Sequence, residues 1–186
     1  MQSASFAQED VPPVLHIEAA SNASLDEPLE FTWIISNPGA KPVYIYTSLL
    51  ETERSAFAEL NIHEEKKVIE VGFLRSELIA GLPPYSFPKA SFKPIDPGQS
   101  LRGRFVSEFT ISELKGHKVS GDKLETIKLT PSPWNINGKI AYGYEIESVQ
   151  KALEQSLKEG QEHPFNPINR WQKVVYSELV NVTFHR

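Results

Sequence analysis

The apolar and polar positions along this chain follow, for the most part, the pattern of β-strands. Between Leu29 and Ser36 the apolar side chains Leu29, Phe31, Trp33 and Ile35 share one parity, which is typical of a strand with one buried face. A second β-rich run at 43–47 follows an Asn-Pro-Gly sequence, and such residues favour turns. The stretch 29–50 therefore predicts two strands joined like a hairpin.

The same alternation predicts further strands in the rest of the chain. They lie at about 15–19, 58–62, 69–73, 101–111, 124–129, 134–136, 139–144 and 174–184. Because side chains of one parity lie on one face of a strand, we expect nine of them to form one core between two sheets. These are Phe31, Trp33, Ile35, Leu101, Phe105, Phe109, Val180, Val182 and Phe184.

Three turn sequences indicate how these strands are connected. The polar run 63–67 predicts a hairpin between its flanking strands. Asp96-Pro97-Gly98-Gln99 predicts a β-turn with Pro at the second position and Gly at the third. Asn137-Gly138 is typical of a two-residue type I′ hairpin, which would separate 134–136 from 139–144.

One helix is predicted, at about residues 145–158. Ile146, Val149, Leu153 and Leu157 form an apolar stripe at helical spacing. Glutamate–lysine pairs four residues apart and Gly160 after the last turn also favour a helix that ends there. We expect the stripe to pack on the sheets.

These elements predict an all-β fold, an antiparallel β-sandwich or barrel of seven to nine strands with one inserted helix near residues 145–158. The length of 186 residues suits a single domain. We expect residues 1–10 to be a flexible tail and 11–186 to be the domain. The chain shows no internal repeat and no domain linker.

Two turns resemble those of bacterial immunoglobulin-like domains, and loosely those of small immunoglobulin-like protease inhibitors. The turns are N-x-G-x-x-P-V at 37–43 and P-G-(Q/E)-S at 97–100. The resemblance implies an immunoglobulin-like antiparallel β-sandwich and a role in binding. The insertions at 75–97 and 145–170 depart from the inhibitor pattern, so no inhibitory loop is assigned. The cysteine pair of true immunoglobulin domains is missing.

Composition excludes several classes of protein. Without cysteine there is no disulfide framework, thiolate metal site or cysteine nucleophile. A net charge of −5 and the lack of any basic stripe argue against nucleic-acid binding, and no apolar run approaches the ~18 residues of a membrane-spanning helix. The small-x-small sequence Ser5-Phe6-Ala7 before an acidic stretch resembles the end of a secretory leader. We expect a periplasmic or extracellular location, the alternative being the cytoplasm.

The sequence contains no recognisable catalytic motif. Its five histidines have no metal-ligand spacing, and it has no nucleophile elbow, phosphate-binding loop or dinucleotide fingerprint. We therefore expect no enzymatic activity, no cofactor and no metal. A hydrolase whose site is assembled from distant loops is the alternative from another class.

The best candidates for binding lie in two proline-stiffened loops, Ile79–Phe92 and His163–Trp171. Their aromatic anchors would be Tyr85, Phe87, Phe165 and Trp171, with Arg170 as a polar contact. The competing interpretation is that these side chains close an end of the sandwich. Trp134 and Trp171 are similarly open to two interpretations, stacking on a ligand or packing within the fold.

The sequence as a whole predicts a binding or assembly module of the bacterial envelope or extracellular space. It would recognise a protein or a glycan through its loops. A protease inhibitor acting through a protruding loop is the second possibility. The identity of the partner and the oligomeric state are not specified by the sequence.

Overall fold

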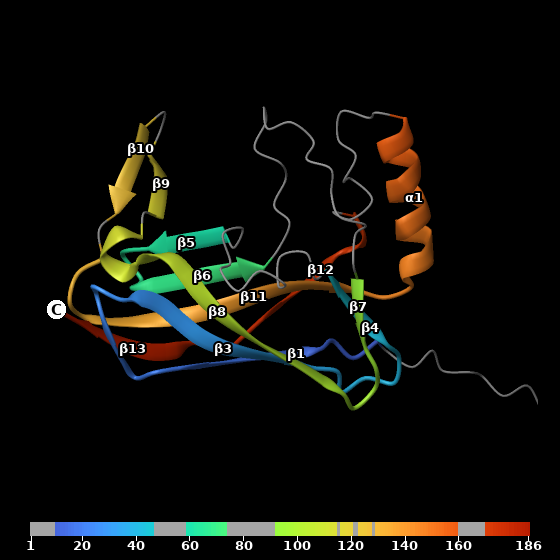
Figure 1. Ribbon diagram of the computed structural model, residues 1–186, viewed down its shortest axis with the longest axis horizontal. Coiled ribbons are helices and arrows are strands. Elements are labelled where there is room, and N and C mark those ends of the chain that lie inside the picture. Colours follow the sequence, from blue (N-terminus) through green and yellow to red (C-terminus); the bar gives the residue numbers. More distant parts are fainter. Residues whose placement is uncertain are drawn as a thin grey trace, which may run out of the picture.

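Two β-sheets share one hydrophobic core (Figure 1). The computed structural model describes residues 10–46, 59–73, 92–114, 116–120, 123–127, 129–159 and 170–186. These residues include thirteen strands, the α-helix Ile146–Lys158 and a short 3₁₀ helix, Ile111–Glu113, and residues 170–171 are also helical. The predicted all-β sandwich with one helix is confirmed. There are more strands than the seven to nine expected, because several are only three to five residues long and so short a run shows little alternation.

The first sheet has three antiparallel strands in the order β1-β3-β8. They are β1 (Val14–Ala19), β3 (Pro28–Ser36) and β8 (Ser100–Thr110). Phe31 and Phe105, which are directly opposite, stack with ring centroids 4.8 Å apart. Trp33 lies over its partner Gly103, where a Cβ atom would be 2.0 Å from the indole ring. The interior is therefore closely packed, and only glycine fits at position 103.

The second sheet is built around β11 (Pro133–Gly143). The other strands of this sheet are β2 (Asn22–Ser24), β4 (Val43–Tyr46), β5 (Glu59–His63), β6 (Val68–Phe73), β7 (Phe92–Ile95), β12 (Lys173–Tyr176) and β13 (Val180–His185). One edge of β11 pairs with β13 and β12, and the other pairs with β6 and β4. β2, β5 and β7 extend the sheet outward. β6 with β11, and β2 with β13, are parallel pairs, which the predicted antiparallel sandwich did not include.

A separate two-stranded ribbon, β9 (Gly116–Ser120) and β10 (Lys123–Ile127), completes the strands. The predicted hairpin around 63–67 is confirmed, with β5 and β6 paired antiparallel and Lys67 N–H donating to the Glu64 carbonyl at 3.1 Å. Lys67 itself has a φ of 50°, as tight turns often require.

The predicted core is largely, but not fully, correct. Six of its nine residues are buried and two are half-buried against the core, while Phe109 is 55% exposed. The buried six are Phe31, Trp33, Ile35, Phe105, Val182 and Phe184, and the half-buried two are Leu101 and Val180.

A β-bulge explains the error at Phe109. Pro28 pairs with Thr110 and Glu30 with Val106, so three residues of β8 lie opposite one of β3. The Ser107 hydroxyl accepts the Leu29 N–H at 2.8 Å and donates to the Phe109 carbonyl at 2.6 Å, which replaces the missing ladder bond. Because a bulge changes the direction of the side chains that follow it, parity alone misplaced Phe109.

The predicted hairpin at Asn137-Gly138 is wrong, because both residues lie inside the continuous strand β11. At this point the partner along one edge changes from β13 to β12. The Ser177 N–H donates to the Gly138 carbonyl and the Gly138 N–H donates to the Ser177 hydroxyl, both at 2.8 Å, while Asn137 Nδ2 donates to the Ser177 carbonyl at 2.7 Å. A Cβ atom on Gly138 would lie 3.1 Å from a methyl group of Ile17. Here glycine permits close packing of the two sheets, not a turn.

The predicted strand 174–184 is divided into β12 and β13, because each of them pairs with a different half of β11. Residues 177–179 face only two residues of β11, so the alternation changes phase between β12 and β13. Val174 and Tyr176 are consequently 38% and 57% exposed, although Val182 is buried.

The strands within 29–50 do not form the predicted hairpin. β3 belongs to the three-stranded sheet and β4 to the other, so 37–42 carries the chain across the sandwich. Residues 47–50 lie outside the described part. The turn at Asp96 is confirmed, with Gln99 N–H donating to the Asp96 carbonyl at 2.9 Å and Gly98 at φ 75°.

Asn37 holds this crossing in place although it is only 1% exposed. Its amide nitrogen donates to the carbonyls of Lys41 and Ile95, both at 2.8 Å, and its amide oxygen accepts the Gly39 N–H at 3.0 Å. Its backbone N–H and C=O bond to residues 99 and 98. The two turns that carry the family resemblance are thus joined through one side chain and its backbone.

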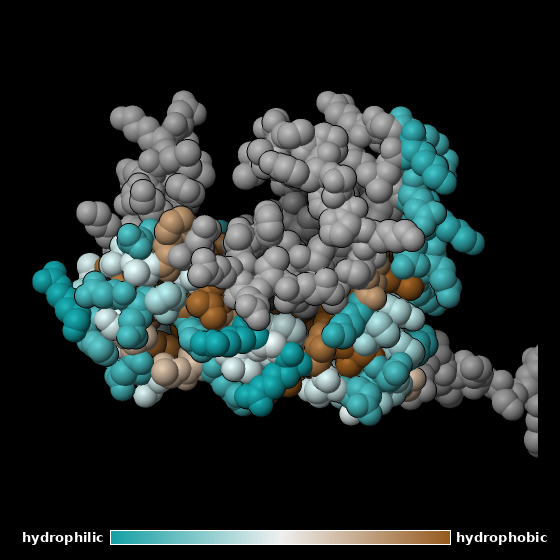
Figure 2. Space-filling view, viewed as in Figure 1, coloured by the Kyte–Doolittle hydropathy of each residue, from teal (hydrophilic) through white to brown (hydrophobic). Residues whose placement is uncertain are grey.

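The helix α1 (Ile146–Lys158) confirms the prediction for 145–158. It extends away from the sheets after β11, and its outer surface is hydrophilic (Figures 1 and 2). Ile146 and Val149 are buried, but outside the core that the sheets share, which departs from the predicted packing onto the sandwich. The side chains of Leu153 and Leu157 lie outside the described part.

Changing Asn37 to Asp should destabilise the fold by about 2 kcal/mol or more, because two buried carbonyl groups lose their donor and meet a carboxylate instead. Chemical denaturation measures the change in the free energy of unfolding. Asn22→Asp is the matched control, since Asn22 is exposed and its amide nitrogen donates to the hydroxyl of the adjacent Ser21. Equal stability of the two variants would show that the Asn37 hydrogen bonds are dispensable.

Candidate functional site

The two predicted binding loops end beside each other. Phe92, at the start of β7, and Trp171, just before β12, make an edge-to-face contact with ring centroids 5.2 Å apart. Of the five predicted site residues, Trp171 is half-buried and Arg170 is exposed. Tyr85, Phe87 and Phe165 lie outside the described residues. The structure thus brings the described ends of both loops to one place.

Trp171 is anchored by two contacts. Its indole N–H donates to the Tyr144 carbonyl at 2.6 Å, and its ring covers Gly143, where a Cβ atom would be 2.2 Å from the indole. These contacts fix the ring against the end of β11. They show a packing role for Trp171 and leave its predicted role as a ligand anchor untested.

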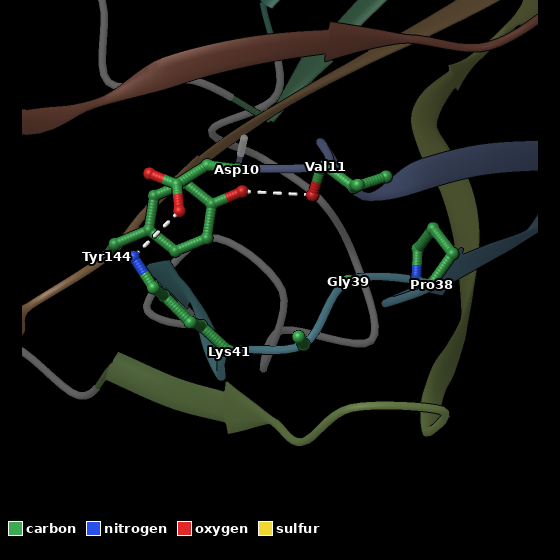
Figure 3. Close-up of a pocket in the computed structure, with 7 residues that line it drawn as sticks. Asp10, Val11, Pro38, Gly39, Lys41 and Tyr144 are labelled. Atoms are coloured by element: carbon green, nitrogen blue, oxygen red, sulfur yellow. Dashed lines mark hydrogen bonds and ion pairs between the residues drawn. The ribbon is translucent and has the colours of Figure 1, made fainter. Parts of the chain in front are cut away.

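Tyr144 also forms a wall of a small pocket at this end of β11 (Figure 3). The pocket has a volume of about 270 Å³. Its other walls come from the first described residues and from the crossing after Asn37: Asp10, Val11, Pro38, Gly39, Ala40 and Lys41.

The N-terminal stretch is attached to the pocket by two interactions. Lys41 Nζ pairs with Asp10 Oδ1 at 2.9 Å, and the Tyr144 hydroxyl donates to the Val11 carbonyl at 3.0 Å (Figure 3). A Cβ atom on Gly39 would lie 3.1 Å from the same carbonyl, so glycine allows the two segments to meet. Asp10, which we assigned to the flexible tail, is therefore held by the domain.

Asp10 and burial influence the protonation of the groups in this pocket. The hydrogen bond and the charge of Asp10 raise the pKa of Lys41, so this lysine is a cation at neutral pH. Burial raises the pKa of Tyr144, as do Tyr142 and Asp10, so its hydroxyl remains a donor. Lys173 Nζ lies 5.1 Å from the centroid of the Tyr144 ring, within cation–π range.

The chemistry available here is recognition. A tyrosine ring, an ammonium and a carboxylate line a pocket below the ~300–1,000 Å³ typical of small-molecule sites. The pocket therefore suits one side chain or one sugar ring of a larger ligand. Among the described residues, no three His, Asp or Glu side chains are grouped so that they could hold a metal ion.

The sequence patterns did not predict this pocket. Asp10, Lys41 and Tyr144 are far apart in the chain, and each looks like an ordinary surface residue. The position of Tyr144 just after a strand and before a helix was the one available signal. Trp134, by contrast, is fully buried with Lys67 Nζ 4.6 Å from its ring centroid, so its packing interpretation is confirmed.

Comparison with known proteins assigns no family. No family model matches the chain, and no curated protein matches it significantly. Among solved structures, a β-glucosidase from Listeria innocua in complex with isofagomine aligns with 10% identity and a TM-score of 0.33. The alignment covers 93% of this chain and 16% of that chain, and a likeness this low assigns neither fold nor function. Within the described residues, no helix is long and apolar enough to cross a membrane.

Changing Gly143 to Ala should displace the Trp171 ring and cost about 2 kcal/mol of stability, because the added methyl group occupies the space of the indole. Denaturation followed by tryptophan fluorescence measures this cost. In a Trp171→Ala background the same change should add no more than about 0.5 kcal/mol. An equal cost in both backgrounds would contradict the contact.

Proposed function

We propose that this protein is a non-enzymatic binding module that recognises a protein or a glycan through the loops at the Tyr144 end of the sandwich. The observation that carries this proposal is the contact between Phe92 and Trp171 beside the Tyr144 pocket. It places the described ends of both proline-rich loops next to a pocket with polar and aromatic walls. Binding sites commonly lie where a rigid sheet holds several loops together.

The packing of this end favours recognition by a preformed surface. Trp171 is held by a hydrogen bond and by its contact with Gly143, and Tyr144 is held by its bond to Val11. A fixed aromatic surface loses little side-chain entropy when it binds. Lys41 and Arg170 are exposed beside it, so they can contact a ligand without disturbing the fold.

The proposed setting is the bacterial envelope or the extracellular space. It is supported by the resemblance of the turns at 37–43 and 97–100 to immunoglobulin-like bacterial domains. In this chain the two turns contact each other, with Asn37 N–H donating to the Gln99 carbonyl at 2.9 Å and Gly98 N–H donating to the Asn37 carbonyl at 2.8 Å.

The proposal is tested by screening the purified protein against a glycan array and a panel of proteases. Changing Lys41 or Arg170 to Ala should weaken binding of the captured probe about tenfold, which equals about 1.4 kcal/mol, with an unchanged melting temperature. Lys66→Ala is the control, because Lys66 is exposed in the turn between β5 and β6.

Three results would count against the proposal. Binding that both substitutions leave unchanged would place the site elsewhere on the molecule. Inhibition of a protease would favour the inhibitor, and hydrolysis of an array glycan would favour the hydrolase.

A further inference from the structure

The strand β12 lies at an edge of the second sheet. It pairs with β11 along one side, and no strand in the described part of the chain pairs with its other side. At the end of this ladder the Ser177 N–H donates to the Gly138 carbonyl. Because bonded and non-bonded pairs alternate along antiparallel strands, Val175 directs its N–H and C=O toward β11. Those of Val174 and Tyr176 therefore point away from β11, toward the edge.

Several other edge strands carry features that oppose pairing with a further strand. β1 and β8 bear charged side chains, such as Glu18 and Arg102, whose ion pair spans 3.2 Å. β7 contains Pro94, and β2 is only three residues long. Charges, proline and short length are common ways to protect a sheet edge. The stretch 174–176 of β12 contains neither a charge nor a proline, so this edge lacks that protection.

The side chains at this edge are apolar and exposed. Val174 and Tyr176 are 38% and 57% exposed, and Leu179, which follows the strand, is 58% exposed. They are three of the six large apolar side chains that are exposed among the described residues. A fourth, Val14, begins β1, which contacts β12. Exposed apolar side chains that are scattered need no explanation, whereas a group of them indicates an interaction surface.

We propose that two copies of this protein associate through β12, with the two strands antiparallel about a two-fold axis at Val175. In this register Val174 of each copy lies directly opposite Tyr176 of the other. Both residues have backbone groups that point away from β11, so they form a hydrogen-bonded pair of the usual antiparallel kind. A β-branched and an aromatic side chain that face each other across two strands also stabilise the pairing.

The charges at the ends of β12 favour a second copy in this orientation. Lys173 begins the strand and Glu178 follows it, and both are exposed. Antiparallel pairing brings the lysine end of each copy to the glutamate end of the other, whereas a parallel arrangement would bring like charges together. The edge is thus complementary to itself in hydrogen bonding, packing and charge, which a two-fold interface between identical chains requires.

Analytical ultracentrifugation over a range of concentrations tests this inference, and a monomer–dimer equilibrium is the expected result. Val174→Lys and Tyr176→Lys should each raise the dissociation constant of the dimer about tenfold or more, because each introduces a charge into the apolar contact. Phe109→Lys is the matched control. Phe109 is 55% exposed, much as Tyr176 is, but it lies on β8, so this change should leave the dimer as it is. The melting temperatures of the diluted variants should match that of the wild type, since all three side chains are exposed.

Cysteine cross-linking then tests the register. The chain has no cysteine, so Val174→Cys and Tyr176→Cys each introduce a single thiol. Under mild oxidation a mixture of the two variants should form the mixed disulfide-linked dimer severalfold faster than either variant forms its own dimer, because positions 174 and 176 face each other only across the two copies.

Two outcomes would overturn the proposal. A monomer at every concentration would leave the edge of β12 to a strand from another protein. A dimer that both lysine substitutions leave intact would place the contact elsewhere on the molecule. Neither outcome depends on ligand binding, so this inference can fail while the proposed function stands.

Discussion

The crossing from one sheet to the other depends on the hydrogen bonds of Asn37. A buried carboxamide is tolerated only when its donors and acceptor are all used, and here the side chain bonds to residues 41, 95 and 39. These bonds determine where β3 ends, where β4 begins and how the turn at 96–99 lies against both. They also place Gly39 and Lys41 in the wall of the pocket, so the candidate site depends on the same interaction.

β11 provides the second constraint, because it has paired strands along both edges and a core on one face. Glycine occurs at two points where a large group comes closest to it. Gly138 leaves room for the Ile17 side chain of the first sheet, and Gly143 leaves room for the Trp171 ring. The strand ends at Gly143. Tyr144 follows it, and its carbonyl holds Trp171 while its hydroxyl holds the N-terminal stretch. The end of this strand thus organises the surface that we propose for binding.

The lysine–carboxylate pair of the pocket and the pair on the second sheet differ in their exposure to water. The pair formed by Asp10 and Lys41 is exposed, so water screens it and it contributes little to stability, which leaves Lys41 available to a ligand. The pair formed by Glu70 and Lys139 is shielded, so its two charges interact more strongly.

Local sequence was sufficient for the elements that depend on local physics. Alternation showed the long strands, helical spacing showed α1, and Pro-Gly geometry showed the turn at 96–99. Among the site residues, composition alone pointed to the loops that end at Phe92 and Trp171. Which strands pair was decided by the tertiary structure, since β3 and β4 could pair or separate with the same local pattern. Asn137-Gly138 favours a turn in isolation, yet Ser177 and Ile17 hold it in a strand. The bulge at Ser107 turned Phe109 outward, and only folding brought together Asp10, Lys41 and Tyr144, or Glu70 and Lys139. Contacts between residues distant in the chain leave no periodic pattern, because the position of each is set by the packing of all the others.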